Sequence, residues 1–372
     1  MSQTGIREPL VGARRVVVKV GTGVVARDDG RLALGRMGAL VEQVRALQEG
    51  GRQVILVSSG AVGLGAERLG FDRKPVSVVD RQACAAAGQS ALMAFYDALF
   101  GRLGGVCAQV LLTEDDFGSR HRHVHLAATL DRLLELGVVP IINENDTVST
   151  AEIALSGATI FGDNDRLSAL VAGGIGADAL ALLTDVDGIY TAPPGEPGSV
   201  RIPVWEGGPV KLGAGSALGR GGMGAKIAAA KVGAASGVHV VVASGGDPQV
   251  LSRVFAGEDV GTWFPAEGGM NSVRRWLAFA TAPEGRLVVN EGARDALIHR
   301  KASLLMPGIS SVDGSFAAGA VVSVCDEAGE FARGRADRSS DEIRAAIGAS
   351  TGRGKAVVHR DQVVIVRGSE AP

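Results

Sequence analysis

Short runs of β-branched and other apolar residues recur through the first two thirds of the chain. They lie at residues 16–20, 54–58, 106–112, 138–142, 179–183 and 238–243. Runs this short and this apolar predict strands that are buried on both faces. Between them, longer segments show a helical pattern, at residues 34–48, 80–103, 129–136, 166–171 and 223–235. Strands alternating with helices predict an α/β fold, a mostly parallel open sheet sandwiched by helices.

The pattern changes near residue 286, where short strand-like runs follow one another. They lie at residues 287–289, 320–324, 356–358 and 363–366, with turn sequences at 312–315 and 327–329 and a helix-sized piece at 341–347. This pattern predicts a small β-rich domain with its own core. The predicted organisation is an N-terminal extension at 1–14, the α/β domain at 15–279, a linker at 280–285, the β-rich domain at 286–367 and a tail at 368–372.

The composition is that of a folded protein without a strong charge bias. Hydrophobic residues make up 46% of the 372 residues, and 38 basic against 40 acidic residues give a net charge of −2. A protein that binds nucleic acid non-specifically would be clearly basic. The three cysteines are widely spaced and match neither a disulfide framework nor a zinc site. We see no signal peptide or membrane-spanning stretch, so we expect a cytoplasmic protein.

Glycine-rich or polar segments follow most of the predicted strands. They lie at residues 19–23, 58–63, 143–146, 162–165, 184–185 and 244–247. In open α/β sheets ligands bind outside the carboxyl ends of the strands. We therefore expect these segments to meet in one polar crevice.

Two lysines among the glycine turns favour phosphoryl transfer as the chemistry of this crevice. Lys19 stands beside one glycine turn, and Lys226 follows the glycine-rich residues 219–224 at a helix start. Glycine turns before helices expose backbone N–H groups that suit phosphate oxygens. Two unit charges ~4 Å apart interact by about 4 kcal/mol at an effective dielectric near 20. Lysines placed against two anionic reactants would offset a repulsion of that size.

Other interpretations of these motifs are open at this point. Residues 219–224 match a dinucleotide fingerprint, although no apolar strand precedes them, and no P-loop sequence is present. His121, His123 and His125 are candidate metal ligands, but a solvated helix start explains them as well. Taken singly, the loop residues are also typical turns and helix caps. Their joint position at one sheet edge is what favours a site.

Four motifs together resemble the glutamate 5-kinases of the amino-acid-kinase family. They are VVKVGTG at 17–23, VSSGA at 57–61, INEND at 142–146 and GDND at 162–165. The sequences LTD at 183–185 and GGM at 221–223 extend the match, as does Lys226. The C-terminal portion resembles a PUA domain, so the likeness covers about residues 15–367.

This resemblance implies an amino-acid-kinase-like fold followed by a barrel-like PUA domain. The implied reaction transfers the γ-phosphate of ATP to the side-chain carboxylate of L-glutamate. Its product, L-glutamyl 5-phosphate, is the first intermediate of proline synthesis from glutamate, and free proline is expected to inhibit. The resemblance also implies Mg²⁺ bridging phosphate oxygens, without an assigned protein ligand, and a homodimer or homotetramer.

The same resemblance assigns roles to individual residues. The residues expected to act in catalysis are Lys19, Lys226 and Asp165, with Asp165 orienting the two lysines. Those expected to hold glutamate are Ser59, Gly60, Asn143, Asp146, Asp163 and Asn164. Those expected to hold ATP are Lys19, Gly21, Thr184, Asp185, Arg220, Gly221, Gly222, Met223, Gly224, Ala225 and Lys226. Arg220, Gly224 and Ala225 stand where the family usually has hydroxylated residues.

A second hypothesis concerns the C-terminal domain. PUA domains elsewhere recognise RNA, and Arg333, Arg335 and Arg338 lie close together in the sequence. A solvated surface explains these arginines as well, and the net charge of −2 argues against a polyanion as the main partner. RNA binding or regulation through this domain is therefore the alternative to a purely enzymatic function.

Overall fold

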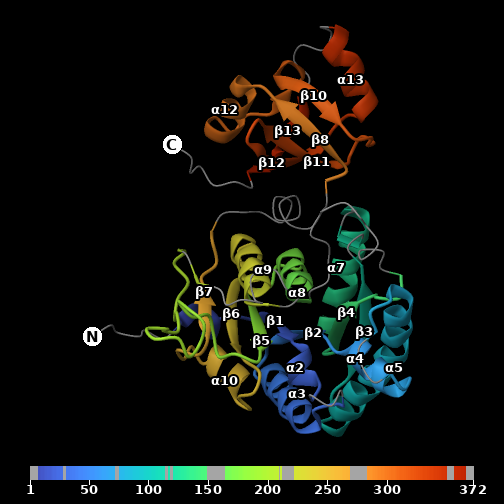
Figure 1. Ribbon diagram of the computed structural model, residues 1–372, viewed down its shortest axis with the longest axis vertical. Coiled ribbons are helices and arrows are strands. Elements are labelled where there is room, and N and C mark those ends of the chain that lie inside the picture. The colour runs from blue at the N-terminus through green and yellow to red at the C-terminus, as the bar shows by residue number, and fades with distance from the viewer. Residues whose placement is uncertain are drawn as a thin grey trace. The chain divides into compact units, whose positions relative to one another are not determined.

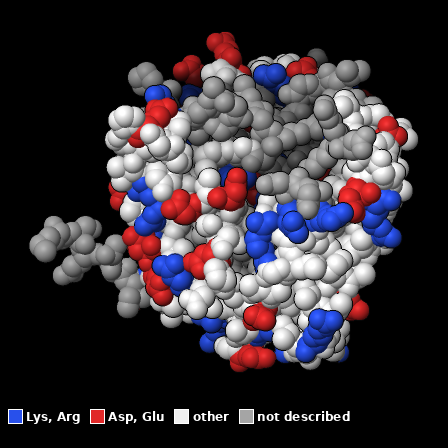
Figure 2. All heavy atoms as spheres, turned by 60° about the horizontal axis from the view of Figure 1, so that its bottom comes forward, with Lys and Arg blue, Asp and Glu red and all other residues white. Residues whose placement is uncertain are grey.

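The computed structural model describes residues 7–27, 31–71, 75–113, 116–117, 120–148, 164–208, 210–211, 222–268, 283–349 and 356–365. The chain divides into two compact units. The larger unit comprises Met1–Asp116 and Arg120–Gly269, and the smaller one comprises Phe117–Ser119 and Met270–Pro372. Figure 2 shows basic and acidic side chains intermixed on one face, as the near-balanced composition predicts.

A seven-stranded sheet forms the centre of the larger unit, in the order β3-β4-β2-β1-β5-β6-β7 (Figure 1). The strands are β1 (Arg15–Val20), β2 (Gln53–Ser58), β3 (Cys107–Leu112), β4 (Val139–Glu144), β5 (Ala179–Thr184), β6 (His239–Ser244) and β7 (Thr262–Phe264). All neighbours pair in parallel except β6 and β7. The predicted α/β sheet is confirmed. The sequence did not reveal β7, because three residues at a sheet edge are too few to show a period.

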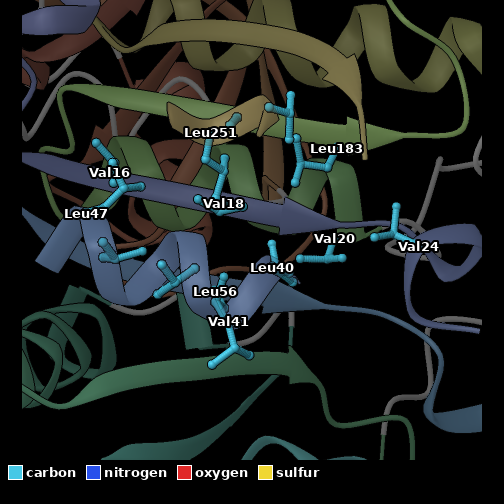
Figure 3. Packing of buried hydrophobic residues seen from close by; sticks show 14 of the residues in the cluster. Val16, Val18, Val20, Val24, Leu40, Val41, Leu47, Leu56, Leu183 and Leu251 are labelled. Atoms are coloured by element: carbon cyan, nitrogen blue, oxygen red, sulfur yellow. The ribbon is translucent and has the colours of Figure 1, made fainter. Parts of the chain in front are cut away.

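Helices pack on both faces of this sheet. They are α1 (Glu8–Val11), α2 (Thr22–Val25), α3 (Leu34–Glu49), α4 (Ala61–Arg68), α5 (Val78–Arg102), α7 (Arg120–Glu135), α8 (Asn164–Gly174), α9 (Met223–Ala235) and α10 (Val250–Phe255). On one face Val16, Val18 and Val20 of β1 join a cluster with Leu40 and Leu47 of α3 (Figure 3). Helix α8 contacts β1 and α9 contacts β6. Because these strands are buried on both faces, their sequences are nearly continuous apolar runs.

Two glycines allow α4 and α5 to touch through their backbones. A Cβ atom on Gly65 would lie 1.7 Å from the carbonyl oxygen of Cys84, and one on Gly88 would lie 1.8 Å from that of Ala61. No side chain fits at either position. The crossing matters for the site because α4 begins directly after Gly60, where β2 has ended and the chain turns with a φ of 105°.

The smaller unit contains a six-stranded sheet in the order β10-β8-β11-β12-β13-β9. Its strands are β8 (Gly285–Val289), β9 (Leu304–Leu305), β10 (Ile309–Asp313), β11 (Val321–Asp326), β12 (Gly329–Ala336) and β13 (Ala356–Ile365). A three-residue 3₁₀ turn, Met306–Gly308, joins β9 to β10 at opposite ends of the strand order. The sheet therefore curls back on itself, as expected for a barrel-like domain. Register shifts within four of the strand pairs mark irregularities that favour such curling.

Several elements of this unit differ from the expectation. The runs predicted at 356–358 and 363–366 form one strand, β13, because the charged residues between them are exposed positions of a continuing strand. Strand β12 and helix α12 (Glu291–His299) were not predicted, since β12 alternates polar and apolar residues instead of forming an apolar run. Helix α13 (Ser340–Ala349) matches the predicted helical piece.

Candidate active site

A cavity of about 790 Å³ lies where the carboxyl ends of β1, β2, β4 and β5 deliver their following residues. The predicted residues that line it are Lys19, Gly21, Ser59, Gly60, Asn143, Asp146, Asn164, Thr184, Asp185 and Lys226. They come from segments that lie far apart in the chain, from Lys19 to Lys226. Parallel strands bring such ends to one edge, which is the placement that the sequence pattern predicted.

Two lysines share one buried carboxylate at this cavity. Lys19 is the fifth residue of β1 (Arg15–Val20), and its Nζ lies 2.5 Å from Oδ1 of Asp165. Lys226, in the first turn of α9, donates a hydrogen bond of 3.2 Å from Nζ to Oδ2 of the same residue. The side chain of Asp165 is only 1% exposed. Three different elements, β1, α8 and α9, therefore hold the two ammonium groups around one anion.

The charge state of Asp165 follows from this environment. Burial by itself raises the pKa of its carboxyl group, but the positive charges of Lys19 and Lys226 and their hydrogen bonds outweigh the burial. The net effect is a pKa below the ordinary value. Two basic side chains thus share one ionised carboxylate. The excess positive charge faces a cavity and suits an anionic ligand.

Hydrogen-bonded side chains line the cavity beside the lysines. Nδ2 of Asn164 lies 2.9 Å from Oγ of Ser59, 3.0 Å from the carbonyl oxygen of Ser58 and 3.0 Å from Oδ1 of Asn143. Oγ of Ser58 lies 3.0 Å from the hydroxyl of Tyr96 on α5. Burial raises the pKa of Tyr96 to about 12, so this hydroxyl stays neutral. The network ties β2, β4, α5 and α8 together behind the cavity.

Two glycines lie at close approaches where strands end. A Cβ on Gly21 would lie 3.2 Å from the carbonyl oxygen of Leu183 and 3.7 Å from Nζ of Lys19. Gly60 has a φ of 105°, and a Cβ there would lie 3.2 Å from Cγ1 of Val25. At Gly60 the positive φ strains any larger residue, and at Gly21 a Cβ would make a tight contact with the carbonyl oxygen of Leu183. On β5, Oγ1 of Thr184 donates a hydrogen bond of 2.7 Å to Oδ1 of Asp185.

Some predicted residues do not line the cavity. Residues 244–247 after β6 were expected at the shared edge but are absent from its lining. Gly245 instead lies against Val24, since a Cβ on it would come within 2.3 Å of Cγ2 of that side chain. Residues 222–225, at the start of α9, also do not line it. Asp163, Arg220 and Gly221 lie outside the residues that the structure describes.

Arg81 lines the cavity but was not predicted. It belongs to the first turns of α5 (Val78–Arg102), and Pro75, Val76 and Val78 line the cavity from the same stretch of chain. Arg81 stands in no motif, and nothing distinguishes it in sequence from the other basic residues. The packing of α5 against α4, which the sequence does not reveal, brings this helix to the site.

The described residues hold neither a cluster of potential metal ligands nor a membrane-spanning helix. Within the ranges that the structure describes, no group of three or more His, Cys, Asp or Glu residues could hold a metal ion. His123 and His125 lie near the beginning of α7. The three cysteines are not disulfide-bonded. Across the same ranges no helix is both long enough and apolar enough to cross a lipid bilayer.

The fold and the cavity place the chain among α/β proteins that bind ligands at the carboxyl ends of a parallel sheet. Comparison with family models narrows this class. The model of the amino acid kinase family matches residues 14–244, and the model of the PUA domain matches residues 285–360. The chain belongs to the amino acid kinase family.

Curated relatives match almost the whole chain. It is 41% identical over 377 residues to the glutamate 5-kinase of Pelobacter propionicus, which covers 97% of this chain and 100% of the relative. It is 44% identical over 384 residues to the glutamate 5-kinase of Bifidobacterium adolescentis, covering 98% of this chain and 99% of the relative. Among solved structures, UMP kinase from Bacillus anthracis aligns with a TM-score of 0.45 and 17% identity, over 69% of this chain and 98% of that one.

Proposed function

We propose that this chain phosphorylates the side-chain carboxylate of L-glutamate with ATP and releases L-glutamyl 5-phosphate, the first step of proline synthesis from glutamate. The observation that carries the proposal is the pair of lysines held on Asp165 at the edge of a cavity of about 790 Å³. The names of the near-full-length relatives support the choice of substrate.

The reaction needs charge neutralisation more than proton transfer. A glutamate carboxylate is already ionised at neutral pH, so its oxygen attacks the γ-phosphorus of ATP without a general base. The new O–P bond forms as the bond to the β-phosphate oxygen breaks, and ADP leaves with that electron pair. We assign Lys19 and Lys226 to the oxygens of the transferring group and Asp165 to holding both lysines in place. Such fixed charges stabilise a transition state without having to reorganise.

We assign the remaining residues by family resemblance, and for those that line the cavity their position there supports the assignment. The proposed glutamate-binding residues are Ser59, Gly60, Asn143, Asp146, Asp163 and Asn164. The proposed ATP-binding residues, besides the lysines, are Gly21, Thr184, Asp185 and 220–225. The catalytic domain is proposed to span 15–279 and the PUA domain 286–367, with the linker at 280–285 between them.

We also propose that Mg²⁺ accompanies ATP. The described residues contain no cluster of three potential metal ligands, and Asp165 is engaged by two lysines. A magnesium ion bound through phosphate oxygens needs no such cluster, because it commonly keeps waters and few protein ligands. When bound it would neutralise charge on the phosphates.

Inhibition by proline and assembly into a homodimer or homotetramer are further parts of the proposal, and they rest on family resemblance. The cytoplasmic location expected from the sequence is proposed as well. RNA binding by the PUA domain gains no added support from its arginines. Nε of Arg333 lies 2.7 Å from Oε1 of Glu330, and Nε of Arg335 donates to the carbonyl oxygen of Gly319 at 3.3 Å. Two of the three arginines thus form contacts within the domain itself.

Hydroxylamine trapping tests the reaction itself. An acyl phosphate reacts with hydroxylamine, so the full chain with ATP, magnesium, L-glutamate and hydroxylamine is expected to accumulate a hydroxamate. Omitting ATP should abolish it, and adding proline should lower its rate. If no hydroxamate forms with glutamate but aspartate or N-acetylglutamate is turned over, the protein has another substrate specificity within its family.

A second prediction concerns Arg81. Arg81 is the third cation among the described residues that line the cavity, beside Lys19 and Lys226, and we assign its guanidinium to the α-carboxylate of glutamate. Arg81→Gln is expected to raise the KM for glutamate ~10–100-fold, the effect of losing a hydrogen bond to a charged group. Turnover of 4-aminobutyrate, which lacks that carboxylate, should not change.

The matched control for this prediction is Arg102→Gln, which alters an exposed arginine in the last turn of the same helix. This variant should behave like the unaltered chain with both substrates. Equal losses with glutamate and 4-aminobutyrate in Arg81→Gln would show that Arg81 does not contact the α-carboxylate.

A further inference from the structure

Gln89 on α5 is a buried polar residue that the proposed mechanism does not use. Its side chain is largely inaccessible, with the residue only 8% exposed. Its Oε1 accepts a hydrogen bond of 2.8 Å from Nδ2 of Asn143. Asn143 is buried and lines the cavity, whereas Gln89 does not line it. Any effect of Gln89 on a bound ligand therefore passes through Asn143.

The groups around Asn143 determine the orientation of its amide. The backbone N–H of Glu144 donates a hydrogen bond of 2.9 Å to Oδ1 of Asn143, so the oxygen must lie on that side. The amide nitrogen then faces Gln89. Because an amide nitrogen donates and does not accept, Gln89 has to present its oxygen.

This orientation is passed on to Asn164. Oδ1 of Asn143 and the carbonyl oxygen of Ser58 both lie 3.0 Å from Nδ2 of Asn164. Since both are acceptors, only the NH₂ end of Asn164 fits between them, and its Oδ1 is turned away. In the described part of the chain that oxygen is buried and has no hydrogen-bond partner. A donor on a bound ligand is the natural partner for such an acceptor.

We infer that Gln89 is a positioning residue for the amino-acid substrate: by holding the amide of Asn143, it keeps the carbonyl of Asn164 directed at the substrate's ammonium group. The inference rests on the proposed function, because glutamate supplies that ammonium group. Nε2 of Gln89 is buried without a partner among the described residues. The residue therefore acts through its oxygen, and its amide nitrogen is dispensable.

Two substitutions separate the oxygen from the rest of the side chain. Gln89→Met keeps the length but removes the acceptor, which leaves the NH₂ group of Asn143 buried and unpaired. It is expected to raise the KM for glutamate ~10-fold, the effect of one hydrogen bond, with the KM for ATP unchanged. Gln89→Glu keeps an acceptor oxygen and should retain a KM for glutamate near that of the unaltered chain. Gln89→Leu is a second variant without an acceptor.

The matched control is Gln43→Met on α3. Gln43 is also 8% exposed, and its Oε1 accepts a hydrogen bond of 2.9 Å from the backbone N–H of Leu251, away from the cavity. Gln43→Met should lose about as much stability as Gln89→Met, but its KM values for glutamate and for ATP should not change. A further readout is glutarate, which lacks the ammonium group. The preference for glutamate over glutarate should fall ~10-fold in Gln89→Met.

The assay on the full, unaltered chain comes first and distinguishes the possible failures. If that chain does not turn over glutamate, the proposed function and this inference both fall. If it does, an unchanged KM for glutamate in Gln89→Met and Gln89→Leu overturns the inference alone. Equal rises in the KM for glutamate and the KM for ATP would also overturn it. So would an equal rise in the KM for glutamate in Gln89→Met and Gln89→Glu.

Discussion

Replacing Lys226 by methionine is expected to lower kcat for glutamate phosphorylation by ~10²–10³, the usual loss on removing one fixed charge-stabilising donor. Methionine has a similar length and no charge, so the packing at the start of α9 is largely retained. The lysine contributes most where negative charge accumulates between the two reactants. The loss should therefore appear in kcat and in kcat/KM to a similar extent, with little change in the KM for ATP.

The matched control for this variant is Lys231→Met on the same helix. Lys231 is exposed, and its Nζ lies over the ring of Trp205, 5.3 Å from the centroid. This change should alter kcat by less than about twofold, as surface substitutions usually do. Steady-state kinetics of the two purified variants make the comparison. Near-normal kcat in Lys226→Met, or equal losses in both, would refute the role given to Lys226.

The sequence predicts the sheet well because burial on both faces leaves a strong local signal. Strands such as β1 and β5 are continuous apolar runs, and the polar residues that interrupt this pattern, Lys19 and Thr184, come near the strand ends. The rule that ligands bind at carboxyl ends then places these residues together without any knowledge of the structure. The core of the candidate site was therefore visible as a set of strand ends.

What the sequence could not show is which distant groups pair. Asp165 is a typical residue for a helix start, and nothing local indicates that it contacts lysines from β1 and α9. Arg81 and Gln89 reach the site only because of the path of α5 across α4. The expectation for residues 244–247 failed for the same reason, since Gly245 packs against Val24 instead of opening on the cavity. Tertiary packing decides each of these cases.

The crossing of α4 and α5 gives the largest expected effect on stability. Gly88→Ala would place a methyl group 1.8 Å from the carbonyl oxygen of Ala61 and 2.6 Å from the backbone nitrogen of Gly65. Backbone atoms cannot rotate away, so the two helices must separate. We expect a loss of about 3 kcal/mol or more in the free energy of unfolding, at the upper end of overpacking costs. Activity should also fall, because α4 carries the Ala61–Gly63 wall of the cavity.

Gly101→Ala on the same helix is the control that isolates the crossing. A Cβ at Gly101 meets nothing within 4 Å, so alanine is expected to add roughly 0.5–1 kcal/mol of stability by its better helix propensity. Urea unfolding followed by circular dichroism compares the two variants, with the unaltered chain as reference. Gly88→Ala should therefore lower the free energy of unfolding, whereas Gly101→Ala should raise it. A stable and fully active Gly88→Ala variant would mean that the helices do not meet through their backbones, and the position of Gln89 behind Asn143 would have to be reconsidered.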